Sequence, residues 1–158
     1  MSKKKLIQGV LWAAVIAWTV LALFLTFQNG ADTAQTSGKI AKEIYRILGR
    51  CGIAVEYTKL HQTLRIAAHF VLFCIFGMLL EAAILVSSRH PGMFKSCFPA
   101  LLICTVISII PEVVKLWIPG RHLQWDEVLL NIIGAYGGVF MIALGMKKRK
   151  RNDDTSLK

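Results

Sequence analysis

The stretch that decides the fold is residues 111–138, PEVVKLWIPGRHLQWDEVLLNIIGAYGG, which links two hydrophobic segments that are each long enough to span a bilayer. Its polar side chains include Glu112, Lys115, Arg121, Asp126 and Asn131. Ionisable groups in hydrocarbon cost several kcal/mol unless they are paired or hydrated, so they tend to mark functional sites. The sequence therefore predicts that the function lies in this hairpin.

The composition is that of a membrane protein. The chain has 158 residues, of which 55% are hydrophobic, and its mean hydropathy is +0.55. These values are too apolar for an ordinary soluble domain. The net charge of +10 would suggest nucleic acid in a soluble protein, but here Lys and Arg flank apolar segments. Membrane topology explains them better, so we expect no nucleic-acid partner and a single domain over residues 1–158.

Four apolar segments predict four transmembrane helices. They cover residues 6–27, 66–86, 97–118 and 126–146. Each has about the 20 residues that suffice to cross the hydrocarbon core. The first is too long for the apolar region of a signal peptide, and no clean cleavage site follows it. The expected fold class is all-α, an integral membrane four-helix bundle.

The distribution of Lys and Arg predicts the orientation. Basic residues occur at positions 3–5, in the loop that holds Arg89 and Lys95, and in the tail at 147–151. Four spans place these three regions on one side, and the positive-inside rule makes that side cytoplasmic. We therefore expect a multi-pass protein of the cell membrane with both termini in the cytoplasm. The loop at 28–65 would lie outside, although it also carries several cations.

That long outer loop contains a predicted amphipathic helix. From Ser37 to about Gly49, apolar residues recur at helical spacing and basic residues take the other faces. Such a helix is typical of the membrane interface, where it is attracted to anionic lipid. A lid over the bundle is the alternative, and the sequence leaves both open. A second helical stretch at 57–64 is expected to run directly into the span at 66–86.

The polar residues near the predicted outer ends of the spans suggest a shared cavity. Arg65 lies at the mouth of its span, and His69 is one turn deeper on the same face. Pro111 removes a helical hydrogen bond and is expected to kink or open its span beside Glu112. We predict an outward-facing, hydrated ligand pocket lined by Arg65, His69, Glu112, Lys115, Arg121, Asp126 and Asn131.

A purely structural role is the alternative for these residues. Glu112 would then pair with Arg65 or Arg121 to lock helices together, and Asp126 would stabilise the amino-terminal end of the last span. Helix packing alone is achieved at lower desolvation cost by small residues, as the pair Gly134 and Gly138 suggests. The sequence contains no disulfide framework, zinc-ligand spacing, phosphate loop or nucleophile elbow, so we expect no metal and no cofactor and assign no catalytic residue.

The hairpin motifs resemble those of the VanZ-like membrane proteins. The resemblance rests on Glu112, on Pro119-Gly120-Arg121, on Asp126 and Asn131 with the two glycines that follow, and on Arg65-Ile66-Ala67-Ala68-His69-Phe70. Lys115 stands where the family usually has Gln, and Phe73 where it often has Tyr. The resemblance implies a cell-envelope role connected with resistance to teicoplanin, a lipid-tailed glycopeptide antibiotic, and it implies no established reaction.

Three classes of function are compatible with these features. The first is a protein that binds a membrane lipid, a lipid-linked envelope precursor or a lipophilic glycopeptide. The second is a membrane enzyme acting on a lipid head group, with Glu112 or Asp126 as general base, against which the absence of a recognised nucleophile or metal set weighs. The third is a small transporter or flippase subunit, which at this size would have to form a homo-oligomer.

Overall fold

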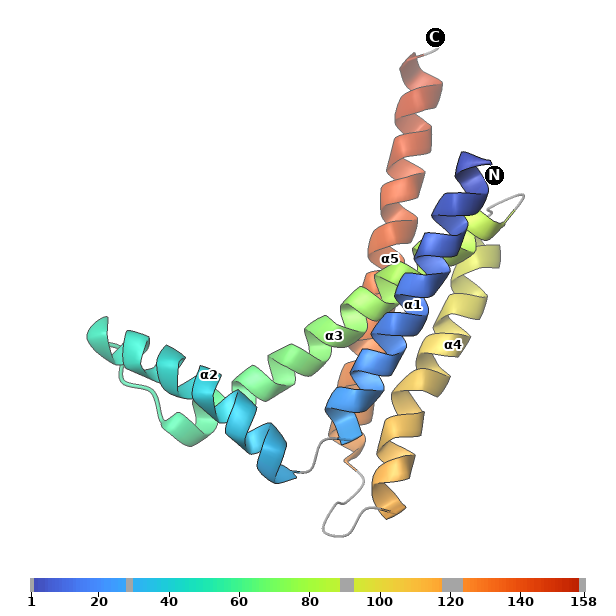
Figure 1. Cartoon of the computed structure of the whole chain (residues 1–158). Coiled ribbons are helices and arrows are strands. Elements are labelled where there is room, and N and C mark those ends of the chain that lie inside the picture. The colour runs from blue at the N-terminus through green and yellow to red at the C-terminus, as the bar shows by residue number, and fades with distance from the viewer. Residues whose placement is uncertain (1, 28–29, 89–92, 118–123, 157–158) are drawn as a thin grey trace.

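A computed structural model describes residues 2–27, 30–88, 93–117 and 124–156. The helices are α1 (Lys3–Phe27), α2 (Gly30–Arg50), α3 (Tyr57–Ser87), α4 (Met93–Val114) and α5 (Trp125–Ser156), and a 3-10 turn, η1 (Lys115–Trp117), continues α4. The described ranges contain no strand. Figure 1 shows α1, α3, α4 and α5 crossing as a bundle, with α2 to one side. The predicted all-α fold is confirmed.

Four of the helices are long and apolar enough to cross a membrane, and they identify a multi-pass membrane protein. Their spanning segments are Lys3–Leu25, Tyr57–Ser87, Lys95–Trp117 and Trp125–Lys148. Each predicted span lies on one of these helices or on its 3-10 extension, apart from residue 118, which lies outside the described residues. The largest difference is in α3, which begins at Tyr57 because the helical stretch predicted at 57–64 joins the span without a break. Pro111 is tolerated within α4, which remains α-helical to Val114 and then tightens into η1.

The core of the bundle lies where α3 meets α5, with α1 and α4 packed on either side. Phe73, Phe76 and Leu80 of α3 are buried against Ala135 and Val139 of α5. Two tryptophans of α1 also hydrogen-bond to α3. The indole of Trp18 donates to the carbonyl of Leu72 at 2.9 Å, and that of Trp12 donates to the Ser87 hydroxyl at 3.0 Å. These bonds satisfy polar groups that hydrocarbon would leave unpaired.

Glycines allow α3 and α5 to approach closely. A Cβ atom added at Gly138 would lie 2.0 Å from the carbonyl oxygen of Cys74, and one at Gly134 would lie 2.6 Å from that of Phe70. The contact is reciprocal, because a Cβ at Gly77 of α3 would lie 2.0 Å from the carbonyl oxygen of Ala135. The predicted packing role of Gly134 and Gly138 is therefore confirmed, and Gly77 is a third member that sequence reasoning missed.

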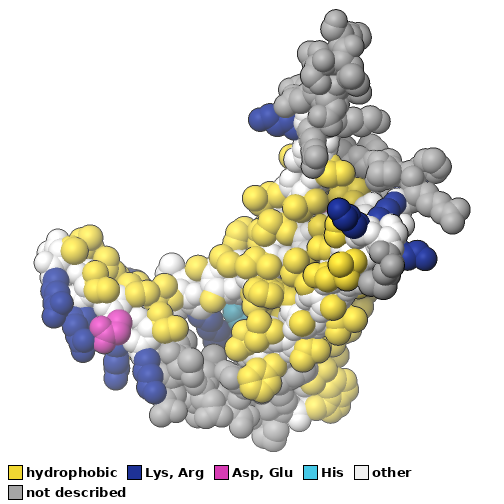
Figure 2. Space-filling view, turned by 45° about the horizontal axis from the view of Figure 1, so that its top comes forward, with side chains coloured by type: hydrophobic (Ala, Val, Ile, Leu, Met, Phe, Trp, Pro, Cys, Tyr) yellow, Lys and Arg dark blue, Asp and Glu magenta, His cyan; other side chains and the backbone are white. Residues whose placement is uncertain are grey.

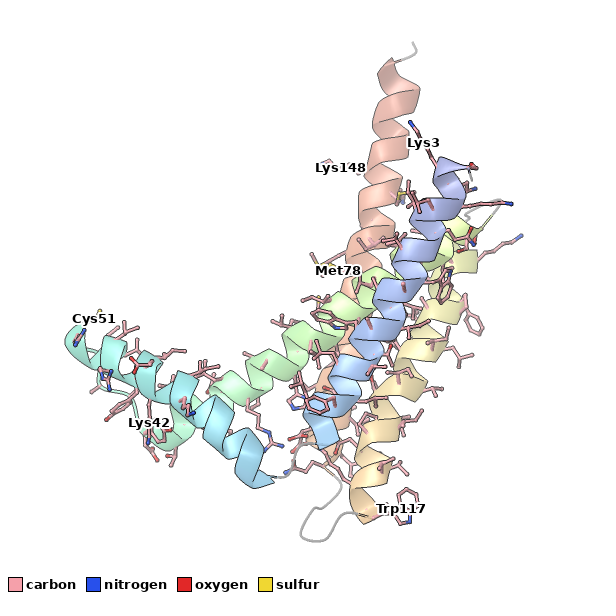
Figure 3. The ribbon with its side chains drawn as sticks, in the orientation of Figure 1. Lys3, Lys42, Cys51, Met78, Trp117 and Lys148 are labelled. Atoms are coloured by element: carbon pink, nitrogen blue, oxygen red, sulfur yellow. The ribbon has the colours of Figure 1, made fainter. Side chains whose placement is uncertain are left out.

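The outside of the bundle is apolar, and its two ends differ. Figure 2 shows hydrophobic side chains over most of its visible face, and exposed residues such as Ile16, Val20 and Phe98 belong to this surface. Such exposure suits a lipid environment. In Figure 3, Lys3 and Lys148 lie at one end of the bundle and Trp117 lies at the other.

The helix α2 forms an arm rather than a lid. It packs against α3 and points away from the rest of the bundle (Figure 1). Ala41 is fully buried in this contact, the Tyr57 hydroxyl donates to the carbonyl of Gly38 at 3.3 Å, and Tyr57 packs edge-on against Tyr45. The amphipathic helix predicted in the long loop is thus present, and it leaves the bundle uncovered.

Candidate functional site

A polar cluster lies at the end of the bundle that carries Trp117. It is a chain of alternating charges that runs from α3 through α5 to the end of α4. The Arg65 guanidinium pairs with one oxygen of Glu127, and the Lys115 ammonium contacts the other oxygen at 2.7 Å. Lys115 also pairs with Glu112. One cation therefore lies between two carboxylates, and it ties α4 to α5.

Burial is greatest at the centre of this cluster. The side chains of Lys115 and Glu112 are 2% and 1% exposed, against 16% for Glu127 and 41% for Arg65. Lys115 lies three residues after Glu112, so the switch from α-helix to 3-10 turn keeps the two side chains on one side of the chain. Removing either charge of a pair buried this deeply would leave the other without compensation.

Gln124 completes the cluster just before α5 begins. Its backbone N–H donates to Oε2 of Glu112 at 3.4 Å, and its side-chain oxygen accepts a hydrogen bond from Arg65 at 3.5 Å. Together with Lys115, this gives each carboxylate oxygen of Glu112 a donor. Gln124 thus connects the buried centre of the cluster to its more exposed edge.

Two buried polar atoms beside the cluster have no hydrogen-bond partner among the described residues. They are Nδ1 of His69 on α3 and Oδ1 of Asn131 on α5. The two side chains are neighbours, and Asn131 is only 1% exposed. An unpaired buried polar group costs about 1–3 kcal/mol, so such atoms in a native protein call for an explanation. A ligand or an ordered water that hydrogen-bonds to these atoms would be such an explanation.

His69 also lines a cavity of about 320 Å³. Its lining comes from the start of α3, from Gln124 and from the first turns of α5, and comprises Gln62, Arg65, Ile66, His69, Gln124, Asp126, Glu127 and Leu130. Most of these side chains are charged or able to hydrogen-bond, and Ile66 and Leu130 are aliphatic. A cavity of this kind suits the polar head group of an amphiphile whose apolar part remains in lipid.

The structure brings together most of the residues predicted to line a pocket, in two layers. Arg65, His69 and Asp126 line the cavity, and Asp126 is exposed at its rim. Glu112, Lys115 and Asn131 form the buried layer beside it. Arg121 lies outside the described residues, so its pairing with Glu112 stays a prediction.

The alternative pairing of Glu112 with Arg65 was wrong. Arg65 pairs with Glu127, and Glu112 pairs with Lys115. Sequence reasoning missed Glu127, although a signal was available, since Glu127 lies four residues before Asn131 and so on the same face of α5. It also missed Gln62 and Gln124, which are polar but uncharged.

Among the described residues, a second group of buried polar side chains lies away from the cavity. Cys97 lies 3.8 Å from the Glu81 carboxylate in the half of the bundle away from the cavity, and both are buried. No three His, Cys, Asp or Glu side chains among the described residues are grouped so that they could hold a metal ion.

Fold and site together define a small multi-pass α-helical membrane protein with a buried charge cluster beside a polar cavity. The chain belongs to the VanZ/LLP1 family, whose model matches residues 11–146. That range includes the whole cluster and most of each of the four spanning segments, and it confirms the resemblance seen in the sequence motifs. No curated protein matches the chain. A comparison with solved structures likewise returns no match.

Proposed function

We propose that this protein binds a cell-envelope amphiphile, with the polar head group in the cavity beside His69 and the apolar part in the surrounding lipid. The observation that carries this proposal is His69, which lines a cavity of about 320 Å³ and has a buried Nδ1 atom without a hydrogen-bond partner. The neighbouring Asn131, in the buried layer beside the cavity, has an Oδ1 atom that likewise lacks one. Together they offer a donor or acceptor on the ring and an acceptor on the amide, which suits hydroxyl and amide groups.

The orientation of the site is part of the proposal. Lys3 and Lys148 lie at the end of the bundle opposite Trp117 (Figure 3). The positive-inside rule would place these lysines in the cytoplasm and the cavity at the outer face of the membrane. There it would meet lipid-linked envelope precursors and lipid-tailed glycopeptides such as teicoplanin. If the protein binds the precursor or the drug, fewer drug molecules meet the precursor in the membrane. Susceptibility to the drug would then fall.

The test compares cells that produce the parent protein with cells that produce His69→Gln or Asp126→Asn. Both positions line the cavity, and neither forms an ion pair with another described residue, so both variants should accumulate normally. We expect each to lose protection against teicoplanin while susceptibility to a glycopeptide without a lipid tail stays unchanged. Mass spectrometry of lipid that co-purifies with each protein provides a second readout.

His61→Gln and Glu43→Gln are matched controls. Glu43 lies on α2 and His61 lies near the start of α3, and neither residue lines the cavity. They should retain protection and co-purifying lipid. If the cavity variants accumulate normally and protect as well as the parent, the site assignment is refuted.

A further inference from the structure

We propose that α2 is a docking surface for a bilayer leaflet rich in anionic phospholipid, on which the arm lies parallel to the membrane. This surface has an apolar face with Ile40 and Ile47. Its basic face carries Lys39, Lys42, Arg46 and Arg50. It is separate from the cavity and does not depend on the proposed ligand.

The apolar face of α2 is only partly covered by the protein. The helix α3 buries Ala41 and half-buries Ile44 and Leu48. Ile40 and Ile47 remain 58% and 56% exposed, and Ile53 beyond the helix is 51% exposed. A soluble helix would not leave such residues in water as a row, so the face calls for an apolar partner. These residues extend from the middle of α2 to just beyond its end, which suits an extended surface rather than a single side chain.

The charge of the basic face selects the chemistry of that partner. Between Gly38 and Arg50 there are four cations and a single carboxylate, Glu43, which pairs with Arg46 at 2.8 Å. Among the described residues, Lys39, Lys42 and Arg50 have no ion-pair partner. Each exposed Lys or Arg close to an anionic membrane contributes about 1 kcal/mol of attraction. A second copy of this chain would instead meet the same positive charge and be repelled.

The direction of the arm fits a membrane surface. In Figure 2 the hydrophobic side chains of the arm follow its upper edge. The basic side chains follow its lower edge. Figure 3 shows Lys42 on that lower side. An interfacial helix has this arrangement, because its apolar face sinks toward the acyl chains while its cations meet phosphates and water.

Spin-label accessibility in a reconstituted bilayer tests the proposal. The parent is Cys51→Ser, which removes the exposed thiol and measures background labelling of the thiols within the spans. Single labels are then placed at Ile40→Cys and Lys42→Cys, which face opposite sides because two residues make about 200° of helical turn. In vesicles containing phosphatidylglycerol, the label at 40 should be accessible to oxygen and shielded from an aqueous nickel complex. The label at 42 should show the reverse.

Removing charge distinguishes anionic lipid from other partners. Lys39→Gln combined with Arg50→Gln should reduce the ratio of immersed to water-exposed label by about fivefold for each cation. Lys147→Gln combined with Lys148→Gln removes the same charge at the opposite end of the bundle and should change nothing. High salt should imitate the first double variant.

Three results would overturn the proposal. The label at 40 could remain open to the aqueous reagent in every bilayer. It could be immersed to the same extent in purely phosphatidylcholine vesicles, which would show that the arm does not require anionic lipid. Its shielding could disappear when the protein is diluted in lipid, which would identify a second copy as the partner.

Discussion

The contact between α3 and α5 has two halves that hold the same pair of helices together by different means. In the dry half, Gly77, Gly134 and Gly138 leave space for the backbone of the facing helix. In the polar half, toward the start of both helices, Arg65 meets Glu127 and His69 lies beside Asn131. The first half depends on the absence of side chains and the second on their charge.

This difference shows why the polar half is the better candidate for function. Small residues already provide close helix packing in the dry half, without any desolvation cost. Beside the polar half, the end of α4 bears that cost in full for Lys115 and Glu112. The polar half itself leaves two buried polar atoms without partners, one of them on His69, which lines the cavity. Packing alone does not require such an arrangement.

The largest effect is expected from Lys115→Met. This change leaves the buried carboxylates of Glu112 and Glu127 without the cation between them, and breaking a buried pair in this way costs about 3–5 kcal/mol. Thermal unfolding of the purified protein in lipid nanodiscs measures the loss. Lys59→Met, at an exposed lysine paired only with Glu56, is the control and should unfold like the parent.

Adding Glu112→Gln to Lys115→Met should recover part of this loss, because it removes one of the two stranded charges. A Lys115→Met protein that unfolds at the parent's temperature would contradict the charge chain as a structural feature.

A somewhat smaller effect is expected from Gly138→Ala in the dry half. The new Cβ would lie 2.0 Å from the carbonyl oxygen of Cys74, so α3 and α5 must separate. Overpacking of this kind costs about 1–3 kcal/mol, and occasionally more. Gly137→Ala is the matched control, since a Cβ at the neighbouring position meets nothing within 4 Å. If both variants are equally stable, the close approach of the helices is wrong.

The sequence predicted the dry half better than the polar half, for a physical reason. The spacing of Gly134 and Gly138 is a local pattern on one helix, and any close helix packing would use it. The partner of Arg65, in contrast, lies 62 residues away on a different helix. Which carboxylate it meets depends on the tilt and rotation of α3, which residue spacing does not determine. The fold class followed from hydropathy, because a bilayer permits few alternatives.

A modest effect is expected from Arg65→Gln at the edge of the polar half. Arg65 is 41% exposed, so solvent screens its pair with Glu127 and the loss should stay below about 1 kcal/mol. Glu127 also keeps Lys115 as a partner at 2.7 Å. Thermal unfolding should therefore separate Arg65→Gln clearly from Lys115→Met. A loss as large as that of Lys115→Met would show that the edge of the cluster is as critical as its centre.

The smallest effect is expected from Tyr136→Phe, which tests an uncharged polar contact in the dry part of the bundle. The Tyr136 hydroxyl lies 2.8 Å from that of Thr105 and joins α5 to α4. Hydrogen bonds between transmembrane helices contribute about 0.6 kcal/mol on average. Thr105 also lies 2.9 Å from the carbonyl of Leu101, so the substitution need not leave its hydroxyl without a partner. Unfolding of Tyr136→Phe, Thr105→Val and the double variant gives the coupling energy directly. A coupling as large as the loss in Lys115→Met would mean that uncharged polar contacts hold these helices as firmly as buried charge.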